Sequence, residues 1–221
     1  MANYAIDKKI LTPYLPANTE IDLWNNVCYV SLVGFMFLDT KVKGIKIPFH
    51  INFEEVNLRF YVRYNDNGEW KRGVVFIKEI VPKPVLMFVA NTVYKEHYET
   101  MPMRHSWVVD SKLSVEYGWK KGRWNSIKVI TDKKGTPILD GSEEEFITEH
   151  YWGYTKISDQ KTSEYGVEHP RWEVYKTLDY TIDVDFGNIY GKDFGFLSKE
   201  KPVSVFLAEG SEIKVKDGTQ I

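Results

Sequence analysis

The chain lacks the features that define several large classes of protein. Its 221 residues contain one cysteine, Cys28, so no intramolecular disulfide can form, which favours a reducing compartment. The first residues lack the basic and apolar blocks of a secretory signal. The longest apolar run, residues 27–38, is too short to span a bilayer. We therefore predict a cytoplasmic protein without membrane partners, in which Cys28 is a buried small hydrophobic residue rather than a nucleophile.

Charge and histidine spacing exclude further classes. The formal net charge is −2, with both signs interspersed, so the basic patch typical of nucleic-acid binding is absent. No phosphate-binding glycine loop, dinucleotide fingerprint or nucleophile elbow occurs. The five histidines lack the spacing of zinc ligands. We predict no metal, no cofactor and no nucleic-acid partner, and the sequence leaves open whether copies of the chain form a homo-oligomer.

Aromatic residues are abundant, at 15% of the chain, which favours β-strands. A strand is expected over residues 26–42, with a bend at Gly34. Residues 53–64 and 69–82 predict a hairpin around the turn sequence Asn-Asp-Asn-Gly at 65–68. Helical periodicity predicts helices over 83–101 and over 141–154, the second beginning at the N-cap Ser142.

Further strands are expected over 106–120, 124–133, 171–187 and 201–218, with turns at 120–123 and 133–136. No repeat or linker divides the chain, so we predict a single domain over residues 1–221. Many strands and few helices favour a mostly β fold, an antiparallel barrel or sandwich with one or two short peripheral helices.

The stretch FEEVNLRFYVRY, residues 53–64, alternates between two kinds of side chain. One face is apolar and is expected in the core, whereas the other face carries Glu55, Asn57, Arg59 and Tyr61. If this polar face lines a cavity, Arg59 can bind a carboxylate through paired hydrogen bonds. Glu55 is then a candidate acid or base, and Asn57 and Tyr61 are candidate ligand-binding residues. The alternatives are a solvated face with ordinary cross-strand pairs, or a structural Glu55–Arg59 ion pair.

Two other segments carry candidate site residues. In EHYETMPMRH, residues 96–105, His97 and Tyr98 are candidate catalytic groups and Met101 a candidate ligand contact. A surface histidine and a core methionine are the alternatives. In EHYWGY, residues 149–154, Tyr154 is a candidate wall of an apolar pocket, and an aromatic core is its alternative.

Several segments in order resemble the YqjF-like proteins, a family of unknown function. These are FEEVNLRFYV, GVVFIKEI, VYKEHYETMPM, FITEHYWGY and SVFLAEGSEIKV. That family is placed in the acetoacetate-decarboxylase-like superfamily, so the resemblance implies a mostly β barrel that encloses a cavity. The decarboxylase uses a lysine, activated by a second lysine, to form a Schiff base. No Lys-Lys pair occurs in the corresponding segment here, where Tyr98 or a near neighbour stands in place of the lysine.

The resemblance and the residues together predict a small-molecule-binding protein with a polar cavity for a carboxylate or other oxyanion. A lyase- or hydrolase-type reaction without a Schiff base is one form of this hypothesis. A non-catalytic carrier or sensor is an alternative, as is an interaction protein whose cavity is filled by its own side chains.

Overall fold

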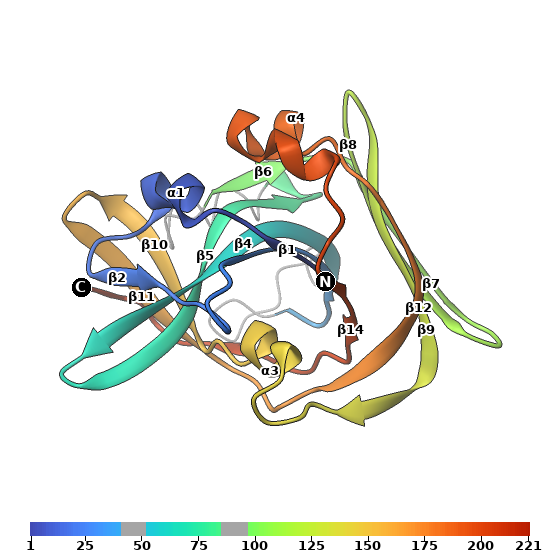
Figure 1. Ribbon diagram of the computed structural model, residues 1–221. Coiled ribbons are helices and arrows are strands. Elements are labelled where there is room, and N and C mark those ends of the chain that lie inside the picture. Colours follow the sequence, from blue (N-terminus) through green and yellow to red (C-terminus); the bar gives the residue numbers. More distant parts are fainter. Residues whose placement is uncertain (41–51, 85–96) are drawn as a thin grey trace.

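The computed structural model describes residues 1–40, 52–84 and 97–221. Their strands form two sheets, and Figure 1 shows the smaller one on the right. The large sheet runs in the order β13-β1-β3-β4-β5-β10-β11-β15, and β2, β6 and β16 pair with β4, β5 and β11. Its strands are β1 (Ala2–Ala5), β2 (Thr19–Ile21), β3 (Tyr29–Phe37), β4 (Phe53–Asp66), β5 (Glu69–Val81), β6 (Tyr98–Thr100), β10 (Trp152–Ser158), β11 (Lys161–Glu168), β13 (Ser204–Val205), β15 (Lys214–Val215) and β16 (Thr219–Gln220).

The second sheet has the order β14-β12-β9-β8-β7. Its strands are β7 (Met103–Val109), β8 (Leu113–Lys121), β9 (Arg123–Pro137), β12 (Glu173–Asp183) and β14 (Leu207–Ala208). Short helices lie around the sheets, namely α1 (Lys8–Leu11), η1 (Thr12–Tyr14), α3 (Glu143–Thr148), α4 (Phe186–Tyr190) and η2 (Lys192–Ser198). In the ranges that the structure describes, no helix is long and apolar enough to cross a membrane.

The mostly β prediction is confirmed, but the closed antiparallel barrel is not found. Within the described ranges both sheets are open, and no strand pairing joins one to the other. The large sheet is also mixed, because β5 pairs in parallel with both β6 and β10. Periodicity reports which faces of a strand are buried, but it does not report which strand lies alongside.

The hairpin of β4 and β5 is the most accurate of the sequence predictions. Its turn residues Asn67 and Gly68 have φ values of 53° and 99°, the left-handed conformation that a two-residue hairpin turn requires. Of the strand predicted over 26–42, the structure has Tyr29–Phe37 as β3, which continues through Gly34; residues 41–42 of that prediction lie outside the described residues. A Cβ at Gly34 would lie 2.8 Å from Cδ2 of Tyr117 in the second sheet, so glycine allows the close approach of the sheets.

Several predicted elements differ from the prediction. The strands predicted over 106–120 and 201–218 are each divided into shorter strands, and the strand predicted over 171–187 ends at Asp183. The predicted helix over 83–101 is wrong at its end, since Tyr98–Thr100 pair with β5 as strand β6; residues 85–96 of that prediction lie outside the described residues. The predicted helix over 141–154 ends at Thr148, and Trp152 begins strand β10. The turn predicted at 133–136 lies inside β9, which continues to Pro137 because β12 pairs with it. Tertiary pairing overrides local preference in the last three cases.

Both faces of β4 are buried. Its apolar residues Val56, Leu58, Phe60 and Val62 join side chains of β8 and β9 in the main core between the sheets. On the opposite face, Phe146 and Ile147 of α3 pack with Tyr61 in a smaller core. Cys28 is buried as predicted, and burial raises the pKa of its thiol to about 11.

Candidate functional site

The polar face of β4 is not a solvated surface. Glu55 and Asn57 are each 1% exposed, and the aromatic ring of Tyr61 lies 5.2 Å from the ring of Phe146 in α3. Burial of a carboxyl and an amide without solvent is unfavourable unless they are hydrogen-bonded. The arrangement of hydrogen bonds on this face therefore decides what each residue can do.

Four side chains from three neighbouring strands form a group that we call the Glu55 cluster: Glu55, Asn57, Glu79 and Tyr98. Asn57 lies opposite Glu79 in the pairing of β4 with β5, and Glu79 lies opposite Tyr98 in the pairing of β5 with β6. Asn57 Nδ2 donates to Glu55 Oε1 over 3.0 Å, and the Tyr98 hydroxyl donates to Glu55 Oε2 over 3.1 Å. Both oxygens of the Glu55 carboxyl are thus held by donors from its own and a nearby strand.

The electrostatics of the Glu55 cluster favour a retained proton. Burial raises the pKa of Glu55 to about 7, although hydrogen bonds from Asn57 and Tyr98 and the charge of Arg59 oppose this rise. Burial, followed by the charges of Glu55 and Glu79, raises the pKa of the Tyr98 hydroxyl well above its ordinary value. A carboxyl that titrates near neutral pH can act as an acid or as a base.

Glu79 is the functional candidate that the sequence did not reveal. Near the turn, the two residue numbers of each cross-strand pair add to 135, as in the pair of Phe60 with Val75. If this register continued along the hairpin, Lys78 would lie opposite Asn57. The structure has a register shift between Leu58 and Arg59 that leaves Ile77 without a partner on β4, and this bulge moves Glu79 opposite Asn57.

Arg59 is partly buried at the end of α3. Its Nη2 donates to the carbonyl oxygen of Ile147 over 3.2 Å. Arg59 Nε and Asn57 Oδ1 are buried, and neither has a hydrogen-bond partner among the residues described. Glu55 and Arg59 make no direct ion pair within this set, so the structural pair considered as an alternative is not formed. Tyr61 instead donates to Ser31 Oγ over 2.7 Å.

The remaining sequence-predicted residues lie elsewhere. His97 is exposed, and its carbonyl oxygen accepts the N–H of Glu79 over 3.1 Å. Met101 and Tyr154 belong to the main core, and the Tyr154 hydroxyl donates to Glu164 Oε2 over 3.0 Å. Tyr98 and Met101 are three residues apart in an extended chain, so their side chains face opposite sides of the sheet. The structure therefore places neither Met101 nor Tyr154 beside Glu55, because both belong to the main core.

A second polar group, which we call the His150 cluster, lies beneath α3: Asp22 and His150, which are buried, and Arg72, whose side chain is 38% exposed. Asp22 Oδ2 accepts from Arg72 Nε over 2.6 Å and lies 3.2 Å from His150 Nε2. Burial lowers the pKa of His150 to about 4 against the opposing effect of Asp22. Burial raises the pKa of Asp22, but hydrogen bonds from His150 and Arg72 outweigh it and lower that pKa overall.

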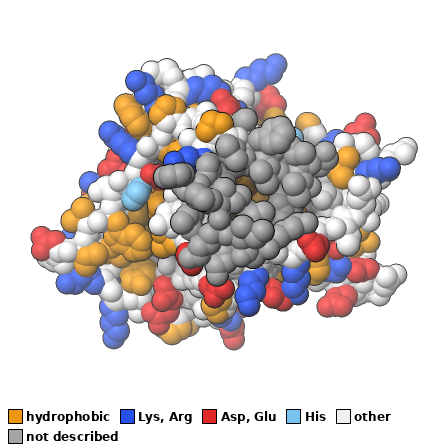
Figure 2. All heavy atoms as spheres, turned by 180° about the vertical axis from the view of Figure 1, so that it is seen from behind, with side chains coloured by type: hydrophobic (Ala, Val, Ile, Leu, Met, Phe, Trp, Pro, Cys, Tyr) orange, Lys and Arg blue, Asp and Glu red, His pale blue; other side chains and the backbone are white. Residues whose placement is uncertain are grey.

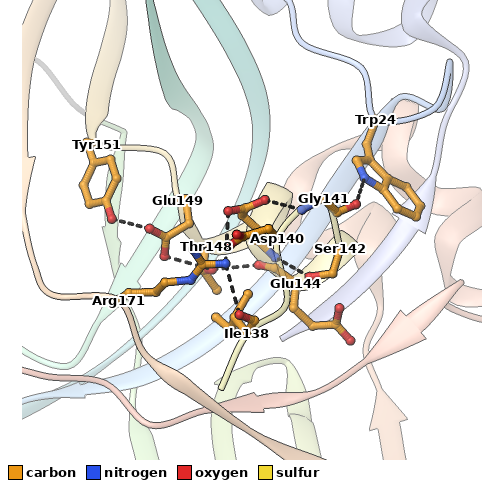
Figure 3. Close-up of polar contacts among 11 residues, drawn as sticks. Trp24, Ile138, Asp140, Gly141, Ser142, Glu144, Thr148, Glu149, Tyr151 and Arg171 are labelled. Carbon is orange, nitrogen blue, oxygen red and sulfur yellow. Dashed lines mark hydrogen bonds and ion pairs between the residues drawn. The ribbon is translucent and has the colours of Figure 1, made fainter. Parts of the chain in front are cut away.

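Polar contacts join α3 and the loop before it to Arg171, in the segment between β11 and β12 (Figure 3). Arg171 forms ion pairs with Asp140 at 2.8 Å and Glu145 at 3.0 Å, and it donates to the carbonyl oxygen of Ile138 over 3.1 Å. Ser142 accepts the N–H of Glu145 as the predicted N-cap. The segment that covers Arg59 and Tyr61 is therefore fixed at its exposed side by several charged groups.

The architecture is that of the acetoacetate-decarboxylase-like proteins. The chain aligns over 100% of its length with 84% of a structure of the enduracididine biosynthesis enzyme MppR with HEPES buffer bound, at a TM-score of 0.65 and 13% identity. It also aligns over 100% of its length with 82% of the acetoacetate decarboxylase of Legionella pneumophila, at a TM-score of 0.60 and 12% identity. At such identities these likenesses show the fold alone.

A family model then places the chain more closely. Residues 1–212 match the DUF2071 family, described as an uncharacterized conserved protein, and the chain belongs to that family. It is also 32% identical over 76 residues to the uncharacterized protein YqjF of Bacillus subtilis (strain 168), a match that spans 34% of this chain and 30% of that relative. The resemblance identified in the sequence is confirmed.

Proposed function

We propose that the Glu55 cluster binds a small carbonyl compound bearing a carboxylate or other oxyanion, and that Glu55 exchanges a proton with it. The observation that carries this proposal is a buried carboxyl, held by donors on both oxygens, with a pKa raised to about 7. Perturbed acids of this kind concentrate at functional sites. Proton transfer next to a carbonyl is the simplest chemistry that such a group performs.

Arg59 and Asn57 supply the complementary binding groups. Arg59 is near enough to lower the pKa of Glu55 by its charge, and a guanidinium is suited to binding a carboxylate. Within the described ranges, Arg59 Nε and Asn57 Oδ1 are a buried donor and a buried acceptor without hydrogen-bond partners. Groups of this kind call for a water molecule or a ligand.

The fold supports a small oxo acid as the compound class. One solved structure that aligns with 99% of this chain, at a TM-score of 0.60 and 13% identity, is the enzyme MppR complexed with pyruvate. A Schiff base is not part of the proposal. Lys78, the neighbour of Glu79 in β5, donates to Glu99 and to the carbonyl oxygen of Ile189, and its partner Leu58 faces the main core.

The proposed step has a simple balance. The Glu55 carboxylate removes a proton from the carbon beside the carbonyl, and the electron pair moves to the carbonyl oxygen. Return of a proton from the Glu55 carboxyl restores the ketone. In deuterated water the carboxyl exchanges with solvent, so deuterium enters the substrate at that carbon. A lyase- or hydrolase-type reaction would use the same proton transfer in a longer sequence.

Nuclear magnetic resonance tests this directly with pyruvate, longer oxo acids, diketones and dicarboxylates in deuterated water. We expect binding and deuterium incorporation with the wild-type chain, binding without incorporation for Glu55→Gln, and weakened binding for Arg59→Ala. Tyr61→Phe is the matched control, because its hydroxyl lies on the same face but contacts Ser31. Binding without incorporation by wild type identifies a carrier or sensor, and an absence of binding to every compound overturns the proposal in favour of a structural role.

A further inference from the structure

Strand β7 forms one edge of the second sheet, and β8 is its pairing partner among the described strands; the side chain of His105 contacts Glu54 of β4, with 2.7 Å between Nδ1 and Oε1. Every residue from Arg104 to Val109 is exposed. The inner side pairs with β8 from Met103 to Val109 without a register shift, and no strand in the described part of the chain pairs with the outer side. A regular seven-residue edge strand of this kind is a template for further pairing.

The backbone hydrogen bonds at the two ends of β7 show which groups point outward. The N–H of Lys120 donates to the carbonyl of Pro102, and the N–H of Asp110 donates to the carbonyl of Lys112. Hydrogen-bonded and non-hydrogen-bonded pairs alternate along an antiparallel ladder, so the even-numbered residues of β7 are bonded to β8. The backbone N–H and C=O groups of Met103, His105, Trp107 and Val109 therefore point away from the sheet.

The strand has few of the features that usually protect an edge. Its sequence, MRHSWVV, contains no proline or lysine and one charged residue, Arg104, and its pairing with β8 has no bulge, whereas isolated edges commonly carry such features. Trp107 is 56% exposed and Val109 is 66% exposed. Figure 2 shows hydrophobic side chains gathered on the side of the molecule where this sheet lies. Open backbone groups and exposed apolar side chains thus occur on the same strand.

We propose that two copies of the chain associate by antiparallel pairing of their β7 strands about a two-fold axis at Trp107. This register places Trp107 opposite its equivalent as a hydrogen-bonded pair and His105 opposite Val109. It also places Arg104 opposite Asp110 twice. Arg104 has a side chain that is 57% exposed; its guanidinium lies over the ring of Trp124 at 4.4 Å and reaches the carboxylate of Glu116 only at 3.8 Å, so none of the described carboxylates forms a short ion pair with it.

The charges and the symmetry favour a second copy over an unrelated strand. A two-fold axis places β7 of one copy against β7 of the other, so both β7 edges are paired within a dimer. The Arg104–Asp110 pairs are satisfied only by a partner that carries the same sequence in the antiparallel direction. The two copies of the second sheet become one continuous sheet across the axis.

Sedimentation velocity on the full chain, over a range of concentrations, tests the association. We expect a reversible dimer for wild type and a monomer for Val109→Lys, which puts a charge on the edge. Leu139→Lys is the matched control, because Leu139 is 73% exposed and lies outside β7, so this variant should remain dimeric. Circular dichroism checks that each variant is folded.

Charge exchange tests the register. Arg104→Asp or Asp110→Arg alone should weaken dimerisation about tenfold or more, because each makes two like-charge pairs, and the double variant should restore it. Amide hydrogen exchange should show protection of His105, Trp107 and Val109 that disappears on dilution, while Ser106 stays protected. A wild-type monomer at every concentration, or a dimer that Val109→Lys leaves intact, overturns the proposal.

Discussion

The Glu55 cluster and the His150 cluster lie on the same side of the large sheet, yet their buried carboxyls have different hydrogen-bond donors. In the His150 cluster one carboxylate, Asp22, serves two basic side chains. In the Glu55 cluster the carboxyls of Glu55 and Glu79 lie near a phenol, and the bonds to Glu55 come from a neutral amide and a hydroxyl.

This difference gives the two buried carboxyls pKa shifts of opposite sign. The hydrogen bonds from Arg72 and His150 keep Asp22 ionised, so its pKa falls in spite of burial. Glu55 has neutral donors and only the more distant charge of Arg59, so burial prevails and its pKa rises. A buried carboxyl thus becomes a permanent ion or an exchangeable acid according to the charge of its hydrogen-bond donors.

Removal of Asp22 should give the largest effect. Asp22→Ala removes the shared acceptor of buried His150 and of Arg72, whose side chain is 38% exposed and can turn to water, and we expect the lost hydrogen bonds to lower the free energy of unfolding by about 3 kcal/mol. Asp183→Ala is the matched control, since its ion pair with Arg123 is exposed on both sides and should contribute less than about 1 kcal/mol. Urea titration measures both. Equal losses would show that the His150 cluster is no stronger than a surface pair.

The two clusters should affect stability in opposite ways as pH changes: one contribution to the free energy of unfolding decreases with rising pH and the other increases. Glu55 has a folded pKa of about 7 against an ordinary value of 4.5, so its contribution to stability is present below pH 4.5 and is lost as pH rises from 4.5 to about 7. His150 has a folded pKa of about 4 against 6.5, so its contribution is present above pH 6.5 and is lost as pH falls to about 4.

Single variants separate these slopes. Relative to wild type, Glu55→Gln should gain roughly 3 kcal/mol in unfolding free energy as pH rises through the Glu55 interval. The free energy of unfolding of His150→Gln should fall relative to that of wild type as pH rises from about 4 to 6.5. Denaturant unfolding at a series of pH values measures both differences. Parallel curves for wild type and Glu55→Gln would contradict the raised pKa of Glu55.

Two tyrosines on this side of the sheet offer a finer comparison. Tyr98→Phe removes a donor to Glu55, and Tyr61→Phe removes a donor to Ser31; each should cost about 1 kcal/mol. Only Tyr98→Phe should raise the pKa of Glu55 further, because the Tyr98 hydrogen bond favours the ionised carboxyl. Titration of carbon-13-labelled glutamate carboxyls by nuclear magnetic resonance distinguishes them, and the same pKa in both variants would refute the role of Tyr98.

The smallest effect is expected at the surface contacts of α3. Arg171→Ala breaks ion pairs whose arginine side chain is 38% exposed, so we expect a loss of less than about 1 kcal/mol. The Phe146 amide donates to the carbonyl oxygen of Ser142. In Arg171→Ala its hydrogen exchange should become faster than the small loss of global unfolding free energy alone would explain. An unchanged exchange rate would show that apolar packing alone holds α3.

Local features of the site could be predicted from the amino-acid sequence. Alternation in residues 53–64 placed Glu55, Asn57, Arg59 and Tyr61 on one face, the Asn-Gly pair set the turn, and Ser142 marked the start of α3. These features depend on side-chain period and on the conformations of single residues. The family resemblance added the fold class.

The residues that contact Glu55 are set by long-range strand pairing, which the amino-acid pattern does not report. Glu79 joins because one extra residue in β5 shifts the register, and Tyr98 joins because residues 98–100 pair in parallel with β5 instead of continuing a helix. The same extended backbone turns Met101 into the main core. Pairing of distant strands depends on the packing of the whole sheet, and a one-residue shift exchanges the two faces of a strand, so periodicity alone could not assign these positions.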